Sequence, residues 1–287
     1  MNEIQNISLQ TTKIRSFFEA NSYIENNKTH GIALGSIPYS IEINDLHFQY
    51  TEDQCEILKG INLKIKAGTK IAIVGENGVG KTTLTKLLLR LYDVSSGSIL
   101  INGNNIKDIC LKELRENVAV VFQNSKVYAA SIKDNLKVYD QQLNDDTLNN
   151  ALKLFDFNSV INKANANLDS QMTKEFDSDG IILSGEQTQL FAIARLFTKE
   201  FGLLIFDEPS SALDPLREYE LNKVMMSEIK NSTVIIISHR LSTIRDVDCI
   251  YVMSDGIIME QGTHNELMEQ CGLYYEMFNK QAENHKK

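Results

Sequence analysis

Hydrophobic and polar residues alternate from Tyr39 onward, which is the pattern of strands with one buried face. The segments 39–50 and 55–68 both follow it, and we expect them to be strands of an antiparallel sheet. Further along, short continuous apolar runs replace the alternation, and most are followed by a helical pattern. Such runs are typical of strands buried on both faces of a parallel sheet. These runs lie at 70–75, 117–123, 202–207 and 232–239.

The same patterns divide the chain into an N-terminal extension and one large domain. In residues 1–37, Ile14, Phe17 and Phe18 have helical spacing and precede a polar, Asn-rich stretch, so we expect a helix and a loose linker outside the core. Residues 38–287 then form the main domain, with a helical subdomain at about 125–190. The predicted fold is α/β, with a parallel sheet core, an N-terminal antiparallel β subdomain and an α-helical subdomain.

Composition and charge disfavour several classes of protein. The 287 residues are 43% hydrophobic and carry a net charge of −9, with acids and bases interspersed. A broad nucleic-acid surface needs clustered Lys and Arg, so no nucleic-acid partner is expected. No apolar run approaches membrane-spanning length and no signal-peptide pattern is present, so we expect this chain by itself to be soluble. The four cysteines form no CxxC pair, and we expect reduced, buried thiols.

The segment 75–83 carries the strongest chemical signal. It reads "GENGVGKTT", which fits the phosphate-binding pattern G-x-x-x-x-G-K-[ST] between a predicted strand and a predicted helix. Backbone N–H groups of such a loop converge on phosphate oxygens at a helix N-terminus. The alternative is a glycine-rich turn that binds nothing, but the complete pattern in this context favours a nucleotide site. The predicted site comprises Gly75, Glu76, Asn77, Gly78, Val79, Gly80, Lys81, which pairs with the β- and γ-phosphates, Thr82, which ligates Mg²⁺, and Thr83.

Two carboxylates follow directly after the apolar run 203–206, in "LLIFDEP". Open α/β sheets place ligand chemistry at the carboxyl ends of their strands. Asp207 is therefore a candidate to hold Mg²⁺ through water, and Glu208 is a candidate to polarise a water for attack on the γ-phosphate. The alternative is a solvated acidic turn or helix cap. The phosphate-binding loop upstream favours the catalytic interpretation.

With these motifs in place, residues 40–282 resemble the nucleotide-binding domain of ABC transporters. The resemblance rests on motifs that occur in the order of the family: "FQY", "GENGVGKTT", "VVFQ", "LSGEQ", "LLIFDEP", "SALD" and "ISHR". It implies a RecA-like P-loop NTPase core that uses ATP and Mg²⁺. It also implies two partners: a second ABC ATPase domain, and the transmembrane domains of a transporter at the cytoplasmic face of the cell membrane.

The resemblance implies roles for residues outside the P-loop. Tyr50 matches the aromatic residue that stacks on adenine, although a strand tyrosine can instead pack on its own sheet. Gln123 matches the glutamine that contacts the metal and the attacking water, and His239 matches the histidine that reaches the γ-phosphate. Asp214, in "SALD", matches the loop that links the two sites of a dimer. The predicted catalytic residues are Glu208, His239, Gln123 and Lys81, and the predicted metal ligands are Thr82, Gln123 and Asp207.

The segment "LSGEQ" matches the family signature LSGGQ, which contacts the γ-phosphate bound by the opposite subunit. This match assigns Ser184, Gly185, Glu186 and Gln187 to the composite site, but Glu186 replaces the second glycine. A unit charge about 4 Å from a phosphate is worth up to roughly 4 kcal/mol at an effective dielectric constant near 20. We therefore expect the Glu186 carboxylate to point away or to be offset by a cation; otherwise dimerisation is weakened. The Glu186 carboxylate can also simply stabilise the start of its helix through the helix macrodipole.

Two further segments resemble exporters within this family. Segment 262–281 resembles the C-terminal tail of exporter domains, and segment 174–187 resembles a bacterial subgroup that exports peptides and lantibiotics. These resemblances predict an ATPase domain that dimerises around two Mg-ATP molecules to drive export, with a peptide as a candidate cargo. Ser178 stands where many exporters carry a glutamate that contacts the membrane domain. The candidates to replace that glutamate are Glu175, Asp177 and Asp179.

Two other functions stay open at this point. A soluble ABC ATPase that acts on DNA, RNA or ribosomes usually carries tandem ATPase domains, a coiled-coil insertion or basic arms, and the sequence shows none of these. A regulatory module would bind ATP but hardly hydrolyse it, because Glu186 spoils the composite site. The dependence of ATPase rate on protein concentration distinguishes these functions from an exporter ATPase.

Overall fold

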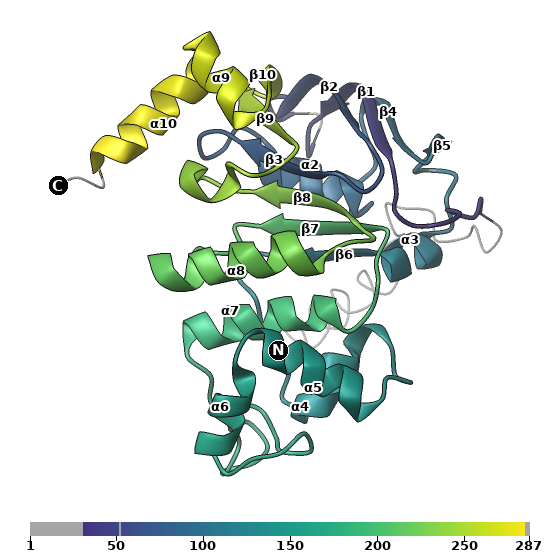
Figure 1. The fold of residues 1–287 in the computed structure, drawn as a ribbon. Helices are drawn as coiled ribbons and strands as arrows, with labels where there is room; N and C mark the ends of the chain where they lie inside the picture. The colour runs from purple at the N-terminus through teal and green to yellow at the C-terminus, as the bar shows by residue number, and fades with distance from the viewer. Residues whose placement is uncertain (1–30, 52, 285–287) are drawn as a thin grey trace, which may run out of the picture.

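A computed structural model describes residues 31–51 and 53–284 of the chain. The helix predicted around residues 14–18 lies outside the described residues. Two β-sheets and a group of helices make up the described part (Figure 1). The helices are α2 (Lys81–Leu88), α3 (Leu111–Asn117), α4 (Ile132–Leu136), α5 (Asp145–Leu154), α6 (Phe157–Lys163), α7 (Gly185–Ala194), α8 (Pro215–Glu228), α9 (His264–Gln270) and α10 (Leu273–Asn284), with short 3-10 turns η1 (Lys137–Tyr139), η2 (Arg195–Phe197) and η3 (Leu241–Ile244).

The first sheet is antiparallel and has the order β2-β1-β4-β5, which confirms the predicted antiparallel subdomain. Alternate residues of its two long strands are buried, because one face packs on the core while the other faces solvent. Its strands are β1 (Ile41–Phe48), β2 (Leu58–Ile65), β4 (Ser96–Ile101) and β5 (Asn104–Asn105).

The second sheet contains the continuous apolar runs and has the order β10-β9-β3-β8-β7-β6. All neighbouring strands are parallel except β9 and β10, which form an antiparallel hairpin at one edge. This arrangement confirms the predicted parallel core, and Figure 1 shows its strands stacked through the centre of the molecule. Its strands are β3 (Lys70–Val74), β6 (Val118–Val121), β7 (Leu203–Asp207), β8 (Thr233–Ile237), β9 (Cys249–Ser254) and β10 (Ile257–Gly262).

The two faces of this parallel sheet bury two separate hydrophobic cores. On one face, Ile73 and Ile205 pack with the antiparallel sheet and with α2. On the other, Val74 and Phe206 pack with α7, α8 and part of the helical segment. Because successive strand residues point to opposite faces, each apolar run serves both cores. The carboxyl ends of β3 and β7 are thereby held in fixed positions.

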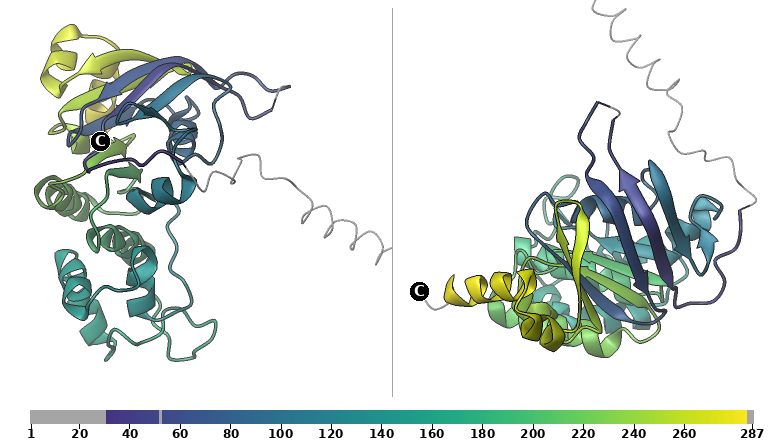
Figure 2. Two further views of the ribbon diagram at one scale, coloured as in Figure 1. Left: turned by 90° about the vertical axis from the view of Figure 1, so that its right-hand side faces the viewer. Right: turned by 90° about the horizontal axis from the view of Figure 1, so that it is seen from above.

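The helices α4, α5 and α6 follow β6 and lie at one end of the molecule, beyond the sheets (Figures 1 and 2). They fall within the predicted helical subdomain, which also includes most of α7. The left view of Figure 2 shows this group at the opposite end of the molecule from the antiparallel sheet. The division of the chain into domains stays a prediction.

The structure corrects two expectations about packing. Leu34 was expected in a loose linker, yet it is 1% exposed in the core beside the antiparallel sheet. Its backbone N–H donates to the Glu113 carboxylate at 2.9 Å, so both its apolar side chain and its polar backbone have partners. All four cysteines are free, as predicted, but none is fully buried, and Cys55 and Cys271 are exposed. They lie at turns and strand ends rather than in the core.

Candidate nucleotide-binding site

The loop between β3 and α2 is shaped by its glycines. Gly75 and Gly80 have φ angles of 154° and 105°, in the region that residues with a side chain rarely adopt. A Cβ atom at Gly75 would lie 2.3 Å from the Met253 carbonyl oxygen, and one at Gly80 would lie 2.5 Å from the Leu58 side chain. The loop can therefore turn tightly against β9 and β2 only with glycine at both positions.

Lys81 begins α2 and turns its side chain back into this loop. It is 6% exposed, and its ammonium donates to the carbonyl oxygens of Gly75 and Glu76, both at 2.8 Å. Burial lowers the pKa of Lys81, while the nearby carboxylates of Glu208 and Asp207 oppose that shift. A phosphate group beside the ammonium would favour its charged form further. The position suits the predicted phosphate contact.

Asp207 ends β7 next to the first turn of α2. It is 4% exposed, and burial raises the pKa of its carboxyl, although a hydrogen bond with Thr82 lowers it. The structure thus brings together a hydroxyl and a carboxylate, which are two of the predicted metal ligands. The described residues contain no cluster of three or more His, Cys, Asp or Glu side chains arranged to hold a metal. Mg²⁺ commonly needs only one or two protein oxygens, because water and phosphates supply the rest, so these donors fit that ion.

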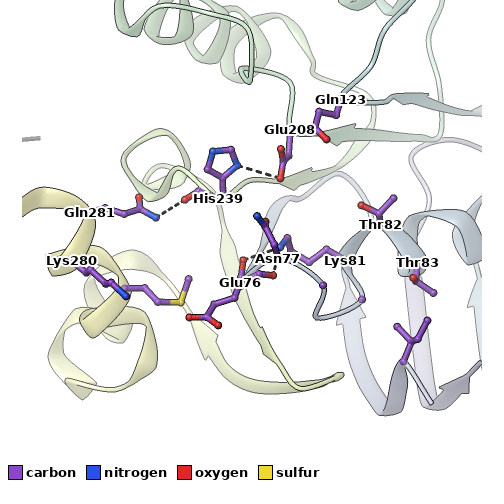
Figure 3. A pocket seen from close by; sticks show the side chains of 15 residues that line it. Glu76, Asn77, Lys81, Thr82, Thr83, Gln123, Glu208, His239, Lys280 and Gln281 are labelled. Carbon is purple, nitrogen blue, oxygen red and sulfur yellow. Dashed lines mark hydrogen bonds and ion pairs between the residues drawn. The ribbon is translucent and has the colours of Figure 1, made fainter. Parts of the chain in front are cut away.

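Glu208 has a backbone conformation that is uncommon for a residue with a side chain. Its φ angle is 54°, and its N–H donates to the Ile237 carbonyl of β8 at 2.9 Å. Its carboxylate Oε1 lies 3.3 Å from Nδ1 of His239, which follows β8 (Figure 3). Glu208 is 14% exposed and His239 48% exposed, so the pair faces an opening rather than the core.

A cavity of about 700 Å³ joins these groups. Figure 3 shows Lys81, Gln123, Glu208 and His239 around this cavity. Lys81 comes from the P-loop, and the other three follow the strands β6, β7 and β8 in that order. The lining includes the four predicted catalytic residues and every predicted P-loop residue except Val79. The predicted site residues that line the cavity are Gly75, Glu76, Asn77, Gly78, Gly80, Lys81, Thr82, Thr83, Gln123, Glu208 and His239.

Val79, Tyr50 and the buried Asp207 do not line this cavity, although they lie close to it. Val79 packs against Gly75 and the adjoining core. The Tyr50 hydroxyl lies 3.2 Å from the Thr83 hydroxyl, and its ring makes edge contacts with Phe48 and Tyr92. Tyr50 is thus next to α2 but packs on its own sheet. Its stacking on adenine stays a prediction.

The signature segment lies at the start of α7 and does not line the cavity. Ser184 caps this helix: its hydroxyl accepts from the Gln187 N–H at 3.2 Å, and its own N–H donates to the Gln187 side chain at 3.0 Å. Gln187 therefore has a structural role in addition to its predicted one. Gly185 is open, with no atom within 4 Å of the position of a Cβ. The turn could still present the Ser184 hydroxyl hydrogen to an anion.

Arg217 provides the cation that the sequence predicted for Glu186. Its guanidinium Nε lies 3.6 Å from the Glu186 carboxylate, with both side chains partly exposed. Arg217 also donates its backbone N–H to Asp214, which caps α8 by accepting from Arg217 and Leu216. The pair connects the signature turn with the predicted dimer-contact loop. Being exposed, it contributes at most about 1 kcal/mol.

Gln189 is a residue whose role the sequence did not indicate. It is 2% exposed, and its side-chain nitrogen donates to the Glu208 carbonyl at 3.1 Å while its oxygen accepts from the Ala212 N–H at 3.0 Å. Through these two hydrogen bonds, the amide links α7 to the segment that carries Glu208. Its place in the helix after the signature gave no sequence signal, because a polar residue there is ordinarily solvent-exposed.

The geometry brings a glycine-rich loop, the Thr82–Asp207 contact and a carboxylate–imidazole pair together at one edge of the parallel sheet. The family model described as ABC transporter matches residues 58–211, more than half of the chain. The chain belongs to the ABC transporter family. It corresponds to the nucleotide-binding domain of exporters in that family, as the resemblance implied.

Individual ABC proteins support the exporter assignment. The chain is 36% identical over 238 residues to the ATP-dependent lipid A-core flippase of Escherichia coli strain K12, and equally to that of Shigella flexneri. Each alignment covers 83% of this chain and 40% of the flippase. Among solved structures, a bacterial Atm1-family ABC exporter with ATP bound has 34% identity and a TM-score of 0.82, covering 88% of this chain and 44% of that one. The chain thus spans less than half the length of these ABC exporters. No helix in its described part has the length and apolarity to cross a membrane.

Proposed function

We propose that this ABC domain hydrolyses ATP to drive export by attached transmembrane domains. The observation that carries the proposal is the meeting of Lys81, Gln123, Glu208 and His239 around one cavity at the carboxyl ends of parallel strands. The P-loop N–H groups and Lys81 would hold the phosphates of ATP. Thr82, with Asp207 and Gln123, would hold Mg²⁺, which supplies charge neutralisation to the β- and γ-phosphates when bound.

In this arrangement Glu208 acts on the attacking water. Its carboxylate accepts a proton from the water as the water's oxygen approaches the γ-phosphorus. His239, at 3.3 Å from that carboxylate, donates a hydrogen bond to the γ-phosphate and fixes the orientation of Glu208. The remaining catalysis is positioning and charge stabilisation by Lys81 and the loop amides, as phosphoryl transfer requires.

The proposed active unit is a pair of such domains. The Ser184–Gly185 turn of one copy would close on the γ-phosphate held by the P-loop of the other, with Asp214 at the contact between the sites. This arrangement accounts for a signature turn that is open to solvent and does not line its own chain's cavity. The transmembrane domains would contact the segment before the signature, where Phe176 is 86% exposed among the carboxylates of Glu175, Asp177 and Asp179. The domain would then work at the cytoplasmic face of the membrane.

The similarity to lipid A-core flippases favours an amphiphilic lipid over the peptide cargo that the sequence suggested. Reconstitution of a transporter that contains this domain, with ATPase stimulation by lipid A compared with stimulation by a hydrophobic peptide, tests the two cargo classes directly.

Dimer-dependent hydrolysis is the first expected result. The ATPase rate per molecule of the isolated chain should rise with protein concentration and then level off, because the composite site forms only in the pair. A rate per molecule that is constant over a hundredfold range of concentration would contradict the composite site. Negligible turnover at every concentration, with ATP bound, would favour the regulatory module instead.

Replacing Glu186 by glycine should strengthen dimerisation in the presence of ATP. The carboxylate adds a negative charge near a partner's phosphate, and Arg217 at 3.6 Å offsets that charge only in part, since both groups are partly exposed. We expect the midpoint of the rate-against-concentration curve to fall about threefold to tenfold in E186G. The variant R217A removes the cation that offsets Glu186, so it should raise this midpoint.

Glu228→Gln is the matched control for these variants, because Glu228 is exposed on the same helix α8 and its substitution removes the same charge away from Arg217. E228Q should leave the midpoint near the wild-type value. An unchanged midpoint in E186G would mean that Glu186 only favours its helix terminus.

A further inference from the structure

The C-terminal helix α10 forms one wall of the ATP cavity. Met277, Lys280 and Gln281 line the cavity together with the P-loop, and Figure 3 shows Gln281 directed toward His239. This helix lies beyond residues 58–211, the part matched by the family model. No role in ATP hydrolysis follows from the family match for these residues.

The side chain of Gln281 bridges the backbone around the candidate catalytic histidine. Its nitrogen donates to the His239 carbonyl at 2.5 Å, and its oxygen accepts from the Leu241 N–H at 3.0 Å. A single planar amide thus holds the chain on both sides of Arg240. Only a side chain with both a donor and an acceptor at this length can make the pair of bonds.

The other side of the same loop is fastened to α8. The Arg240 guanidinium donates to the Glu218 carboxylate at 2.8 Å, and the Arg240 N–H donates to the Ser238 hydroxyl at 2.9 Å. Glu218 is 6% exposed, so this anchor belongs to the protein interior. The loop that carries His239 is therefore held between an interior anchor on α8 and the Gln281 amide on α10.

The start of α10 is well anchored, which gives Gln281 a defined position. Tyr274 is fully buried, and its hydroxyl lies 2.8 Å from Nδ1 of His264. The N–H groups of Leu273 and Tyr274 both donate to the Glu260 carboxylate of β10. From this base the helix extends away from the sheets toward the C-terminus (Figure 1). Gln281 lies on the outer half of the helix and hydrogen-bonds to the loop.

We propose that Gln281 is a positioning residue for ATP hydrolysis, which holds the His239 backbone so that the imidazole keeps its place between Glu208 and the γ-phosphate. The inference rests on the proposed role of His239. Hydrolysis depends steeply on such placement, because a shift of about 1 Å in a catalytic group can lower a rate by roughly 100-fold. A displacement of α10 would therefore reduce turnover without touching the P-loop.

The test compares Gln281→Met with Gln281→Ala in the full chain. Methionine keeps the volume and neutrality of the side chain but removes both hydrogen bonds. We expect kcat for ATP hydrolysis to fall about tenfold in both variants, while KM for ATP changes by less than about twofold. Glu283→Gln is the matched control, because Glu283 is exposed on the same helix. E283Q should keep the wild-type kcat.

A double-mutant cycle with His239→Ala distinguishes positioning from a general structural role. If Gln281 acts through His239, adding Q281M to H239A should lower turnover no further. An equal fold-loss in the H239A background, or wild-type kcat in Q281M, would overturn the proposal. Wild-type turnover in H239A alone would instead refute the role of His239, whatever the effect of Gln281. The two failures are therefore distinguishable.

Discussion

The variant Glu208→Gln should bind ATP as tightly as the wild type but lose nearly all hydrolysis. Glutamine keeps the size and polarity of the side chain, but its amide cannot accept the proton of the attacking water. General-base catalysis typically contributes 100-fold to 10,000-fold, so we expect kcat to fall by at least about 100-fold. Single-turnover ATP hydrolysis and equilibrium binding of a fluorescent ATP analogue measure the two properties separately.

The same substitution should stabilise the ATP-bound pair, since the nucleotides that hold it together are no longer consumed. Size-exclusion chromatography with Mg-ATP should then show E208Q as a dimer where the wild type returns to monomer. Glu116→Gln is a matched control, because Glu116 is 55% exposed on α3, away from the cavity. Turnover near the wild-type rate in E208Q would exclude Glu208 as the base.

The residues that line this cavity could be placed from the sequence because they start or follow regular helices and strands. Lys81 starts a helix, Asp207 ends an apolar strand and Glu208 follows it directly, so the hydrophobic pattern and their positions placed them at the same edge of the sheet. The glycines of the P-loop likewise have a conformational requirement that the sequence displays directly. Such residues can be located without tertiary coordinates.

Other features depended on contacts between distant segments. The sequence indicated that a cation could offset Glu186, but it could not identify Arg217 as that cation. The two residues meet only because the intervening β7 brings α7 and α8 together. The amides of Gln189 and Gln281 bond backbone groups 19 and 42 residues away, and no local pattern marks them. The burial of Leu34 depends in the same way on the sheet beside it. Long-range packing decides these cases.

The variant Lys81→Ala should lose most of its affinity for ATP. The Lys81 ammonium is buried in the loop that receives the phosphates, and a charge-assisted hydrogen bond of this kind is worth about 1.5–3 kcal/mol. At 1.4 kcal/mol for each factor of ten, we expect the Kd for ATP to rise roughly 10-fold to 100-fold. Isothermal titration of Mg-ATP into the variant measures this change.

Adenosine gives the sharpest control for this substitution, because it lacks the phosphates that Lys81 contacts. K81A should bind adenosine with the same affinity as the wild type. The loss of affinity should be confined to ATP and, to a smaller extent, ADP. Lys112→Ala, whose lysine is 83% exposed on α3, should leave all three affinities unchanged. An equal loss for adenosine and ATP would indicate a collapsed loop, since Lys81 also donates to the Gly75 and Glu76 carbonyls. Unchanged ATP affinity would refute the phosphate contact itself.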